Sequence, residues 1–262
     1  MDNKDRQDTL IELLEERGRL SNADLMDALK VSSATLRRDL AELETDGKLM
    51  RFHGGAAHPT ALRGEPSFEE KSRAAIVEKR AIAAAAADLV LPNNTVFLDA
   101  GTTCLEVGRI LMGRKDLTLI GNSIAFAHLA REASARIICV GGEVRGVSGA
   151  LVGALALSWL GHLRADIAFV GASGLTMEGP STTELFEAET KQALIRQATV
   201  RVLVSDATKW GRASAVRFAG WHDFSNWITA GDLPREASGH VQTAGTRVTV
   251  ATLPMDKKRN TK

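Results

Sequence analysis

The chain has 262 residues, of which 44% are hydrophobic and 25% are charged, and its formal net charge is +1. That length fits one large domain or two ordinary ones with a buried core, and the near-neutral charge does not by itself indicate a polyanionic partner. The two cysteines, Cys104 and Cys139, belong to no CxxC motif, which argues against a disulfide framework and favours reduced thiols. The polar start lacks an apolar signal segment, and no apolar stretch is long enough to span a bilayer. We therefore expect a cytoplasmic protein with no membrane partner.

The N-terminal quarter of the chain begins with the pattern of two short helices. Leucine and isoleucine recur at helical spacing over residues 10–14, and Gly18 is expected to end this first helix. Residues 21–24, Ser-Asn-Ala-Asp, form a capping box. We expect a second helix to start there and to bury Leu25 and Leu29.

A third helix and a hairpin are expected to follow. Ser32 or Ser33 is placed to cap a helix that runs to about Thr45. Residues 48–53 form a short extended run, and the glycine pair 54–55 indicates a turn after it. The order of elements is therefore three helices and then a hairpin.

The third helix has two chemically different faces. Leu36, Leu40 and Leu43 are spaced to lie on one side of it and to face a core. The other side carries short, hydroxylated and basic residues, with Arg38 pointing almost directly away from the leucines. A helix that enters the DNA major groove needs such a face, because arginine can donate to O6 and N7 of guanine and a hydroxyl can hold phosphate.

The hairpin after the third helix would act as a wing that reaches the DNA backbone or minor groove. Across helices and wing, the expected DNA-binding residues are Ser21, Ser32, Ser33, Thr35, Arg37, Arg38, Lys48, Arg51 and His53. An alternative stays open, because residues 1–60 hold nine Lys and Arg against twelve Asp and Glu. An acidic three-helix unit of this kind could instead bind a protein, although DNA contact depends on where charge lies and not on its sum.

The rest of the chain alternates strand-like and helical segments. We expect residues 58–74 to be a linker, 75–255 to be a second domain and 256–262 to be a basic tail. An alanine-rich helix is expected from about Arg73 to Leu91. After it, seven apolar runs have the length of strands: 96–98, 117–120, 136–140, 167–170, 200–204, 227–229 and 248–250. This rhythm predicts an α/β domain with a mostly parallel sheet and helices on both faces.

Glycines and polar residues gather where the expected strands end. Residues 99–103, Asp-Ala-Gly-Thr-Thr, follow the first strand and precede a helix, and the N-terminus of a helix favours an anion such as phosphate. Later strands are followed by further residues of this kind: Asn122, Ser123, Gly141, Gly142, Glu143, Gly171, Ser173, Gly174 and Asp206. In open α/β sheets such strand ends converge on one ligand crevice, although a glycine after a strand can also be only a turn.

The charged residues of this half admit two interpretations. Glu187, Glu189 and Lys191, with Asp206 and Lys209, could act as acids and bases in catalysis. They could equally form a solvated helix face and an ion pair at a strand end, and the charge pattern favours that interpretation. The sequence has no Walker loop and no GxGxxG motif, and its six histidines are scattered. We therefore expect no metal, no cofactor and no catalytic residue.

Nearly the whole chain, from about residue 5 to 250, resembles the DeoR family of transcriptional regulators. Residues 31–40, with the Arg-Arg-Asp triplet 37–39, and the Arg-Phe-His-Gly-Gly run 51–55 resemble that family's winged helix-turn-helix. Residues 98–103, 141–143, 169–174, Lys191 and the Asp-Ala-Thr-Lys run 206–209 resemble its sensor domain, where serines more often precede the lysine. The resemblance implies a sensor fold similar to ribose-5-phosphate isomerases and related CoA-transferase-like folds.

The resemblance also implies a bacterial repressor of a carbohydrate operon that responds to a phosphorylated sugar. Carried over by position, the effector site would include Asp99, Gly101, Thr102, Thr103, Gly141, Gly142, Lys191 and Lys209. Its partners would be operator DNA, the sugar phosphate and further copies of the chain, as a dimer or tetramer. Two rivals remain open: a sugar-phosphate isomerase or transferase with an accessory winged helix, and a winged helix that binds a protein.

Overall fold

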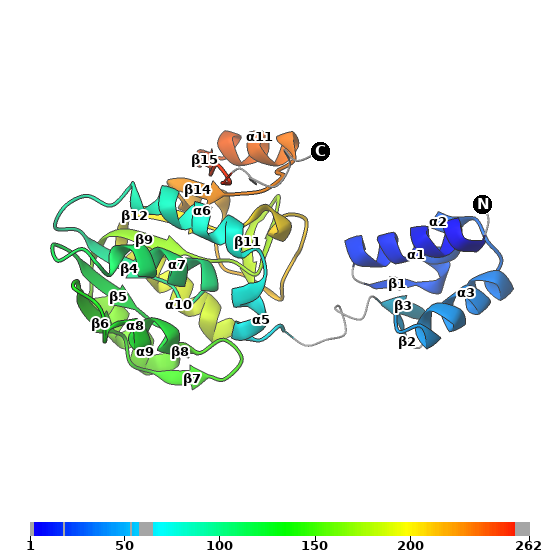
Figure 1. The fold of residues 1–262 in the computed structure, drawn as a ribbon, viewed down its shortest axis with the longest axis horizontal. Helices are drawn as coiled ribbons and strands as arrows, with labels where there is room; N and C mark the ends of the chain where they lie inside the picture. The colour runs from blue at the N-terminus through cyan, green and yellow to red at the C-terminus, as the bar shows by residue number, and fades with distance from the viewer. Residues whose placement is uncertain (1–2, 18, 53, 58–64, 255–262) are drawn as a thin grey trace, which may run out of the picture. The chain divides into compact units, whose positions relative to one another are not determined.

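A computed structural model of the chain describes residues 3–17, 19–52, 54–57 and 65–254 (Figure 1). It divides into two compact units, Met1–Pro66 and Ser67–Lys262. The predicted fold class is confirmed, since the described part of the first unit holds three helices and a small sheet, and the second unit is built on a parallel sheet. Within the described residues, no helix combines the length and the apolar character that crossing a membrane requires.

The first unit packs three helices around a core of leucines. The helices are α1 (Asn3–Arg17), α2 (Asn22–Leu29) and α3 (Ser33–Thr45). Three short antiparallel strands join them in the spatial order β1-β3-β2: β1 (Arg19–Ser21), β3 (Gly55–Ala57) and β2 (Met50–Phe52). The predicted extended run therefore forms β2, while Gly55 belongs to β3 and not to the turn. Strand β1 was not predicted, because its three residues end on the cap of α2 and are too few to show alternation.

The structure confirms the predicted starts of the second and third helices. The Ser21 Oγ accepts a hydrogen bond of 3.1 Å from the Asp24 N–H, and the Asp24 carboxylate accepts one from the Ser21 N–H, which completes the capping box of α2. Ser32, rather than Ser33, caps α3. Helix α2 ends at Lys30, whose backbone is left-handed with φ of 53°. The predicted end of the first helix at Gly18 lies outside the described residues.

The second unit is built on seven strands that pair only in parallel. Their spatial order is β15-β14-β12-β9-β4-β5-β6 (Figure 1). The strands are β4 (Thr95–Leu98), β5 (Thr118–Gly121), β6 (Arg136–Cys139), β9 (Ala165–Val170), β12 (Ala198–Val204), β14 (Asn226–Thr229) and β15 (Arg247–Val250). Each coincides with one of the seven predicted runs, within two residues at either end.

Helices cover both faces of this sheet, as predicted. On one face lie α6 (Ile76–Ala87), α7 (Thr102–Leu111) and α8 (Ile124–Leu129), and on the other lie α9 (Gly153–His162), α10 (Leu185–Arg196) and α11 (Arg235–Thr243). Successive strand residues alternate between the two cores, since Val96 and Leu98 pack in the first and Phe97 in the second. Both faces are buried, so the strands show continuous apolar runs.

Two small antiparallel sheets were not predicted. One is a hairpin of β7 (Glu143–Arg145) and β8 (Ala150–Val152), and the other joins β10 (Gly174–Thr176), β11 (Gly179–Thr182) and β13 (Val216–Arg217). Their strands have two to four residues, which is too short for a periodic signal. Two 3-10 turns follow the later strands: η1 (Ala207–Lys209) and η2 (Trp221–Asp223).

The predicted linker is wrong over residues 67–73. Ser67 caps the helix α5 (Phe68–Arg73), because its Oγ accepts from the Glu70 N–H at 3.2 Å and the Glu70 carboxylate accepts from the Ser67 N–H at 2.8 Å. Pro66 indicated a linker, whereas it precedes a capping box. The predicted alanine-rich helix is correspondingly shorter, as α6. Linker residues 58–64 and the predicted tail 256–262 lie outside the described residues.

Candidate functional site

Helix α3 presents the predicted arginines to solvent. Arg37 and Arg38 are exposed, while Leu36, Leu40 and Leu43 are buried on the opposite side. Ser33, Ala34 and Ala41 are small and exposed on the same helix, so a base edge could approach it closely, while the exposed acids Glu42 and Glu44 lie toward its C-terminal end. Its shape and chemistry are those of a helix that reads the major groove.

Asp39 follows these arginines but is buried and paired within the first unit. Arg6 on α1 donates to its carboxylate from Nε at 2.6 Å and from Nη2 at 2.9 Å. Such a two-point contact between arginine and carboxylate fixes geometry as well as adding energy. The pair therefore holds α1 against α3, and Asp39 serves the fold rather than a ligand.

Most of the predicted hydroxyl contacts are engaged in helix caps. The Ser32 Oγ accepts from the Thr35 N–H at 3.3 Å and lies 3.0 Å from the Thr35 Oγ1. The Ser21 Oγ donates to the Asp24 carboxylate at 2.7 Å. Ser33 is exposed at the first turn of α3. These caps set where α2 and α3 begin, and they make Ser21 a structural residue in the unbound chain.

The wing residues lie in exposed ion pairs. The Arg51 Nη1 is 3.7 Å from the Glu44 carboxylate, and the Lys48 Nζ is 3.6 Å from the Asp46 carboxylate. Exposed pairs of this kind contribute about 0–1 kcal/mol each, so both cations can exchange their partner for a phosphate at little cost. His53 lies outside the described residues.

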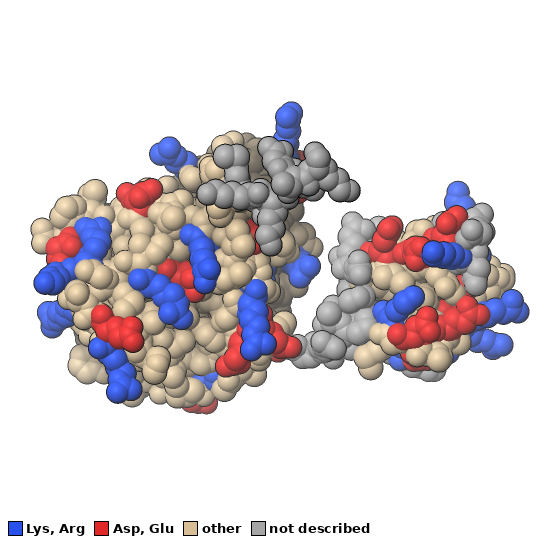
Figure 2. All heavy atoms as spheres, viewed as in Figure 1, with Lys and Arg blue, Asp and Glu red and all other residues tan. Residues whose placement is uncertain are grey.

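One face of the first unit is mainly acidic. Figure 2 shows acidic side chains gathered on the face in view, with basic side chains mostly at its margin. Residues 1–60 hold three more acidic than basic residues, so DNA binding requires that the two signs be segregated. Arg37 and Arg38 supply exposed positive charge on α3.

The predicted phosphate loop lies where the strand order of the sheet reverses. After β4 the chain continues to β5 and β6 on one side, whereas β9 leads to β12, β14 and β15 on the other. Ligands of open parallel sheets bind at this switch point, beyond the carboxyl ends of the strands. Gly101 is the N-cap of α7, and a Cβ added to it would lie 3.7 Å from the Gly171 Cα. Two glycine backbones thus face one another beside the N-terminus of α7.

An ion pair crosses this point. The Lys191 Nζ on α10 donates to the Asp99 Oδ2 and, at 3.2 Å, to the Gly171 carbonyl. The Gly171 N–H donates to the same Asp99 oxygen at 2.9 Å. Burial alone would lower the pKa of Lys191, but attraction to Asp99 and Glu187 outweighs it and raises that pKa above its ordinary value. Lys191 therefore carries a positive charge at the floor of the predicted effector site.

Glu187 and Lys191 contradict the interpretation of α10 as a solvated charged face. Both are buried, one helical turn apart on the side that faces the sheet. The Glu187 carboxylate accepts hydrogen bonds from Ser148 at 2.6 Å, Arg145 at 3.1 Å and Thr182 at 2.9 Å. The sequence did not reveal this role, since the partners lie in the unpredicted short strands and their turn.

Asn122 and Ser123 follow β5 and hold the next loop. The Ser123 Oγ accepts from the Phe126 N–H at 3.4 Å and caps α8. The Asn122 Nδ2 donates to the Leu151 carbonyl at 3.4 Å, while its Oδ1 is buried without a hydrogen-bond partner among the described residues. Asn122 therefore ties this loop to β8 and retains an acceptor for a further donor.

Three of the predicted glycines differ in what surrounds them. Gly142 has φ of +146°, and a Cβ on it would lie 2.6 Å from the Val152 carbonyl oxygen, so it serves the close packing of β7 against β8. A Cβ on Gly174 would lie 2.2 Å from the Arg212 carbonyl oxygen. Packing therefore requires glycine at this position as well. Gly141 is exposed and follows β6, two strand spacings or about 10 Å from β4. Glu143 is exposed beside it, and Ser173 donates its N–H to the Ser181 carbonyl.

A second cationic group lies at the carboxyl end of β12. Burial lowers the pKa of Lys209, and attraction to Asp206 offsets this only in part. Lys79 on α6 is buried and close enough to both for its own pKa, lowered by burial, to respond to their charges. It donates to the carbonyls of Lys71 and Ala74, the latter at 2.6 Å. Glu78 and Glu106 also act on Lys79, while Arg212 and Lys71 add positive charge around Lys209.

Sequence reasoning missed Lys79, although a signal was present. It occupies the buried face of an alanine-rich helix, three residues before Ile82 and three after Ile76. A lysine at an apolar position is seldom buried without a partner. Its position in the middle of that face could have marked it as functional.

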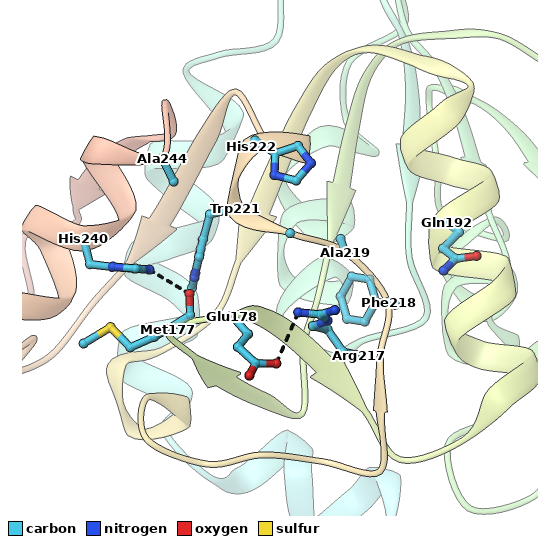
Figure 3. A pocket seen from close by; sticks show the side chains of 11 residues that line it. Met177, Glu178, Gln192, Arg217, Phe218, Ala219, Trp221, His222, His240 and Ala244 are labelled. Carbon is cyan, nitrogen blue, oxygen red and sulfur yellow. Dashed lines mark hydrogen bonds and ion pairs between the residues drawn. The ribbon is translucent and has the colours of Figure 1, made fainter.

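Two cavities flank this unit. One of about 510 Å³ is bounded by α5, α7 and α8 and reaches Thr102, so it adjoins the predicted effector loop. The other, of about 420 Å³, is lined by α11, η2 and the small sheet (Figure 3). There the His240 Nε2 lies 2.7 Å from the Met177 carbonyl oxygen, and Arg217 pairs with Glu178 at 3.2 Å. None of the predicted effector residues lines this second cavity.

Comparisons with known proteins match both halves of the chain. Residues 6–61 match the DeoR-like helix-turn-helix domain, and residues 74–231 match the DeoR C-terminal sensor domain. The chain is 35% identical over 235 residues to the uncharacterized HTH-type transcriptional regulator YgbI of Escherichia coli (strain K12), covering 89% of this chain and 92% of that one. It is 33% identical over 213 residues to the glycerol-3-phosphate regulon repressor of the same organism, covering 80% and 84%.

Among solved structures, ribose 5-phosphate isomerase A from Methanocaldococcus jannaschii matches 50% of this chain and 53% of its own. The identity is 18% and the TM-score is 0.35.

Proposed function

Because this chain belongs to the DeoR family of transcriptional regulators, we propose that it represses a carbohydrate operon and that a phosphorylated sugar controls its binding to the operator. The first unit would bind DNA through α3 and the β2–β3 wing, and the second would bind the effector. The glycerol-3-phosphate regulon repressor among its relatives supports a phosphorylated effector of this class.

The observation that carries the effector assignment is the concentration of buried positive charge at one edge of the sheet. Lys79 and Lys209 both lie close to Asp206, and Arg212 and Lys71 bring further positive charge to Lys209. The N-terminus of α7, with Gly101 and Thr102, lies at the same edge and adds unpaired backbone N–H donors. A phosphate dianion would pair with these cations, whereas a neutral sugar would not.

Of the predicted effector residues, those that follow β4 and β12 are best placed for the phosphate: Gly101, Thr102, Thr103 and Lys209. Asp99 and Lys191 form the floor between them, and Asn122 offers its buried acceptor to a sugar hydroxyl. Gly142 and Gly174 support the loops through close packing, so we assign them no contact with the effector. Ser21 is likewise removed from the proposed DNA contacts because its hydroxyl completes a helix cap.

The same geometry favours sensing over turnover. A general base must be free to take a proton near neutral pH. Asp99 is engaged by Lys191 and Gly171. Burial would raise the pKa of Glu187, but Lys191 and the hydrogen bonds from Ser148 and Thr182 outweigh it and hold that pKa below its ordinary value. Glu187, nominated as catalytic, is therefore held as a charged structural group, and Asp206, the other nominated carboxylate, accepts from the Thr208 N–H at 3.1 Å. We propose that the protein is not an enzyme.

The test is a gel-shift titration of the full chain on DNA upstream of its own gene and of neighbouring sugar genes, at two salt concentrations. Several phosphate contacts should make the operator affinity fall steeply with salt. A panel of sugar phosphates, with the unphosphorylated sugars as controls, should include one that changes the affinity at least tenfold. Binding that is absent or independent of salt would overturn the regulator assignment, and turnover of a sugar phosphate would overturn the sensor assignment.

We further propose that the protein works as a homodimer or tetramer, since a repressor that reads a palindromic operator presents two recognition helices one DNA turn apart. Light scattering of the chain, free and bound to a defined operator, measures the number of copies. A single copy on the operator would contradict this.

A further inference from the structure

The Glu187 carboxylate joins the floor of the effector site to the β7–β8 hairpin. On its own helix it lies one turn before Lys191, which pairs with Asp99. From the hairpin, Arg145 and Ser148 donate to it at 3.1 and 2.6 Å. Thr182 of β11 donates at 2.9 Å and fixes the other oxygen. One buried charge thus holds three donors from two separate small sheets.

The tip of the same hairpin is bonded to the first residue of α5. The Phe68 N–H donates to the Val147 carbonyl at 3.0 Å. Val147 lies in the turn between Arg145 and Ser148, the two residues that Glu187 holds. The Phe68 side chain packs against the core that α6 and α7 form with the sheet. The position of the hairpin therefore sets the position of the first turn of α5.

The far end of α5 is fastened to the other cationic corner. The Lys79 Nζ donates to the carbonyls of Lys71 and Ala74, the last turn of α5 and its cap. Helix α5 is thus bonded at its start through the hairpin and at its end through Lys79. It is also the first element after Pro66, where the unit that carries the DNA-binding helices ends.

We propose that Glu187 is a positioning residue that links occupancy of the effector site to the placement of α5, with the β7–β8 hairpin as the connecting element. The proposal rests on the proposed function for the identity of the two sites. The physical link from Glu187 through the hairpin to α5 is a property of the second unit and is testable without an effector. An effector phosphate that competes for Lys191 would change the balance of charge at Glu187 and, through it, the hold on the hairpin.

Hydrogen–deuterium exchange of the full chain tests the link. Glu187→Gln keeps the size of the side chain and removes the charge that the hairpin donors require. It should speed amide exchange about tenfold or more over residues 143–152 and over 67–74, because charge-assisted hydrogen bonds are the stronger ones. Exchange in β9 and β12 should stay unchanged, which a merely destabilised fold would not allow. Glu189→Gln, on the same helix and half-exposed, is the matched control.

Ser148→Ala removes one donor from the hairpin without touching the buried helix, so it serves if Glu187→Gln does not fold. It should speed exchange in the same two segments by a smaller factor. Faster exchange in the hairpin with unchanged exchange in α5 would overturn the proposal, as would equal effects from Glu189→Gln. The gel shift of the wild-type chain decides the proposed function separately, so a failure of one is not mistaken for a failure of the other.

Discussion

The Lys191 ammonium and the Asp99 carboxylate form a buried pair that joins α10 to the end of β4. The exposed fractions of their side chains are 7% and 3%. The Gly171 backbone supports both partners, since its N–H donates to Asp99 and its carbonyl accepts from Lys191. A buried charge pair is tolerated only where such additional hydrogen bonds satisfy it. The pair therefore makes the strand-order switch point a rigid, charged floor.

Lys191→Met should destabilise the second unit by about 3–5 kcal/mol, because it leaves the Asp99 charge buried without its cation. The double variant Asp99→Asn with Lys191→Met should be less destabilised than the single one, since it removes both charges. Urea unfolding followed by tryptophan fluorescence measures this. All four tryptophans lie in the second unit, at residues 159, 210, 221 and 227, so the signal reports on that unit alone. Additive losses in the double variant would contradict the pairing.

The sequence predicted the parallel sheet because each of its strands is an apolar run of ordinary length bounded by polar turns. It did not predict what the charged side chains of α10 contact. Glu187 and Lys191 looked like a solvated face because i,i+4 charge pairs usually are one. The partners of Glu187 come from the β7–β8 hairpin and β11, whose few residues show no period, whereas Lys191 pairs with Asp99 and Gly171 at the ends of predicted strands. The burial of Glu187 and Lys191 therefore depends on tertiary packing, which the local sequence pattern does not reveal.

In the first unit, the leucine spacing of α3 correctly predicted which face is buried and which carries Arg38. Ser21 shows the limit of that reasoning. The same hydroxyl fits a cap and a phosphate contact, and only its distance to Asp24 distinguishes them. Asp39 lies beside the arginines in sequence, yet its partner Arg6 is 33 residues away. A contact over such a separation leaves no local signal.

Gly101→Ala tests how closely the effector approaches the backbone. Its φ of −65° suits alanine, and the added Cβ would meet nothing nearer than 3.7 Å. The fold should therefore be unchanged, while a methyl group would occupy the space beside the N-terminus of α7. We expect normal operator binding and at least a tenfold loss in effector affinity, measured by thermal shift with the sugar phosphate that the panel identifies. Gly113→Ala, where nothing lies within 4 Å, is the control, and equal responses from the two variants would refute the close approach.

Thr103→Ala and Thr102→Ala remove hydroxyl donors from the phosphate loop. Each should leave operator affinity unchanged and abolish or sharply weaken the response to the effector, because the hydroxyl is proposed to contact only the bound phosphate. Gel shifts with and without the effector measure the response. Thr199→Ala, at an exposed position of β12, should respond like the wild type. A Thr103 variant that responds fully would remove this residue from the site.

Arg38→Ala should weaken binding to the specific operator more than to unrelated DNA. Loss of a two-point contact with guanine costs about 1–3 kcal/mol of discrimination against other bases, whereas non-specific binding depends on phosphates. Competition gel shifts with operator and scrambled duplexes give the ratio. Lys4→Ala, exposed on α1, serves as a charge-matched control. Equal losses on both duplexes would reassign Arg38 to the phosphate backbone.

Glu187 makes the stability of the second unit depend on pH in a definite direction. Burial opposes its charge, but Lys191 and the hydrogen bonds from Ser148 and Thr182 outweigh that effect and lower its pKa in the folded state. A carboxyl group with a lowered folded pKa contributes stability that is fully present above its unfolded pKa, about 4.3 for glutamate. That contribution is lost as the pH falls through the folded pKa.

We therefore expect the free energy of unfolding to decrease below about pH 4.3, and to decrease less steeply in Glu187→Gln, which has no proton to gain at this position. Between pH 5 and 8 the difference between wild type and variant should be constant, since Glu187 stays charged in both the folded and unfolded states. Urea unfolding at a series of pH values, followed by tryptophan fluorescence, measures both trends. Glu189→Gln should follow the wild-type curve, and parallel acid limbs for wild type and Glu187→Gln would show that the Glu187 charge is not held by its partners.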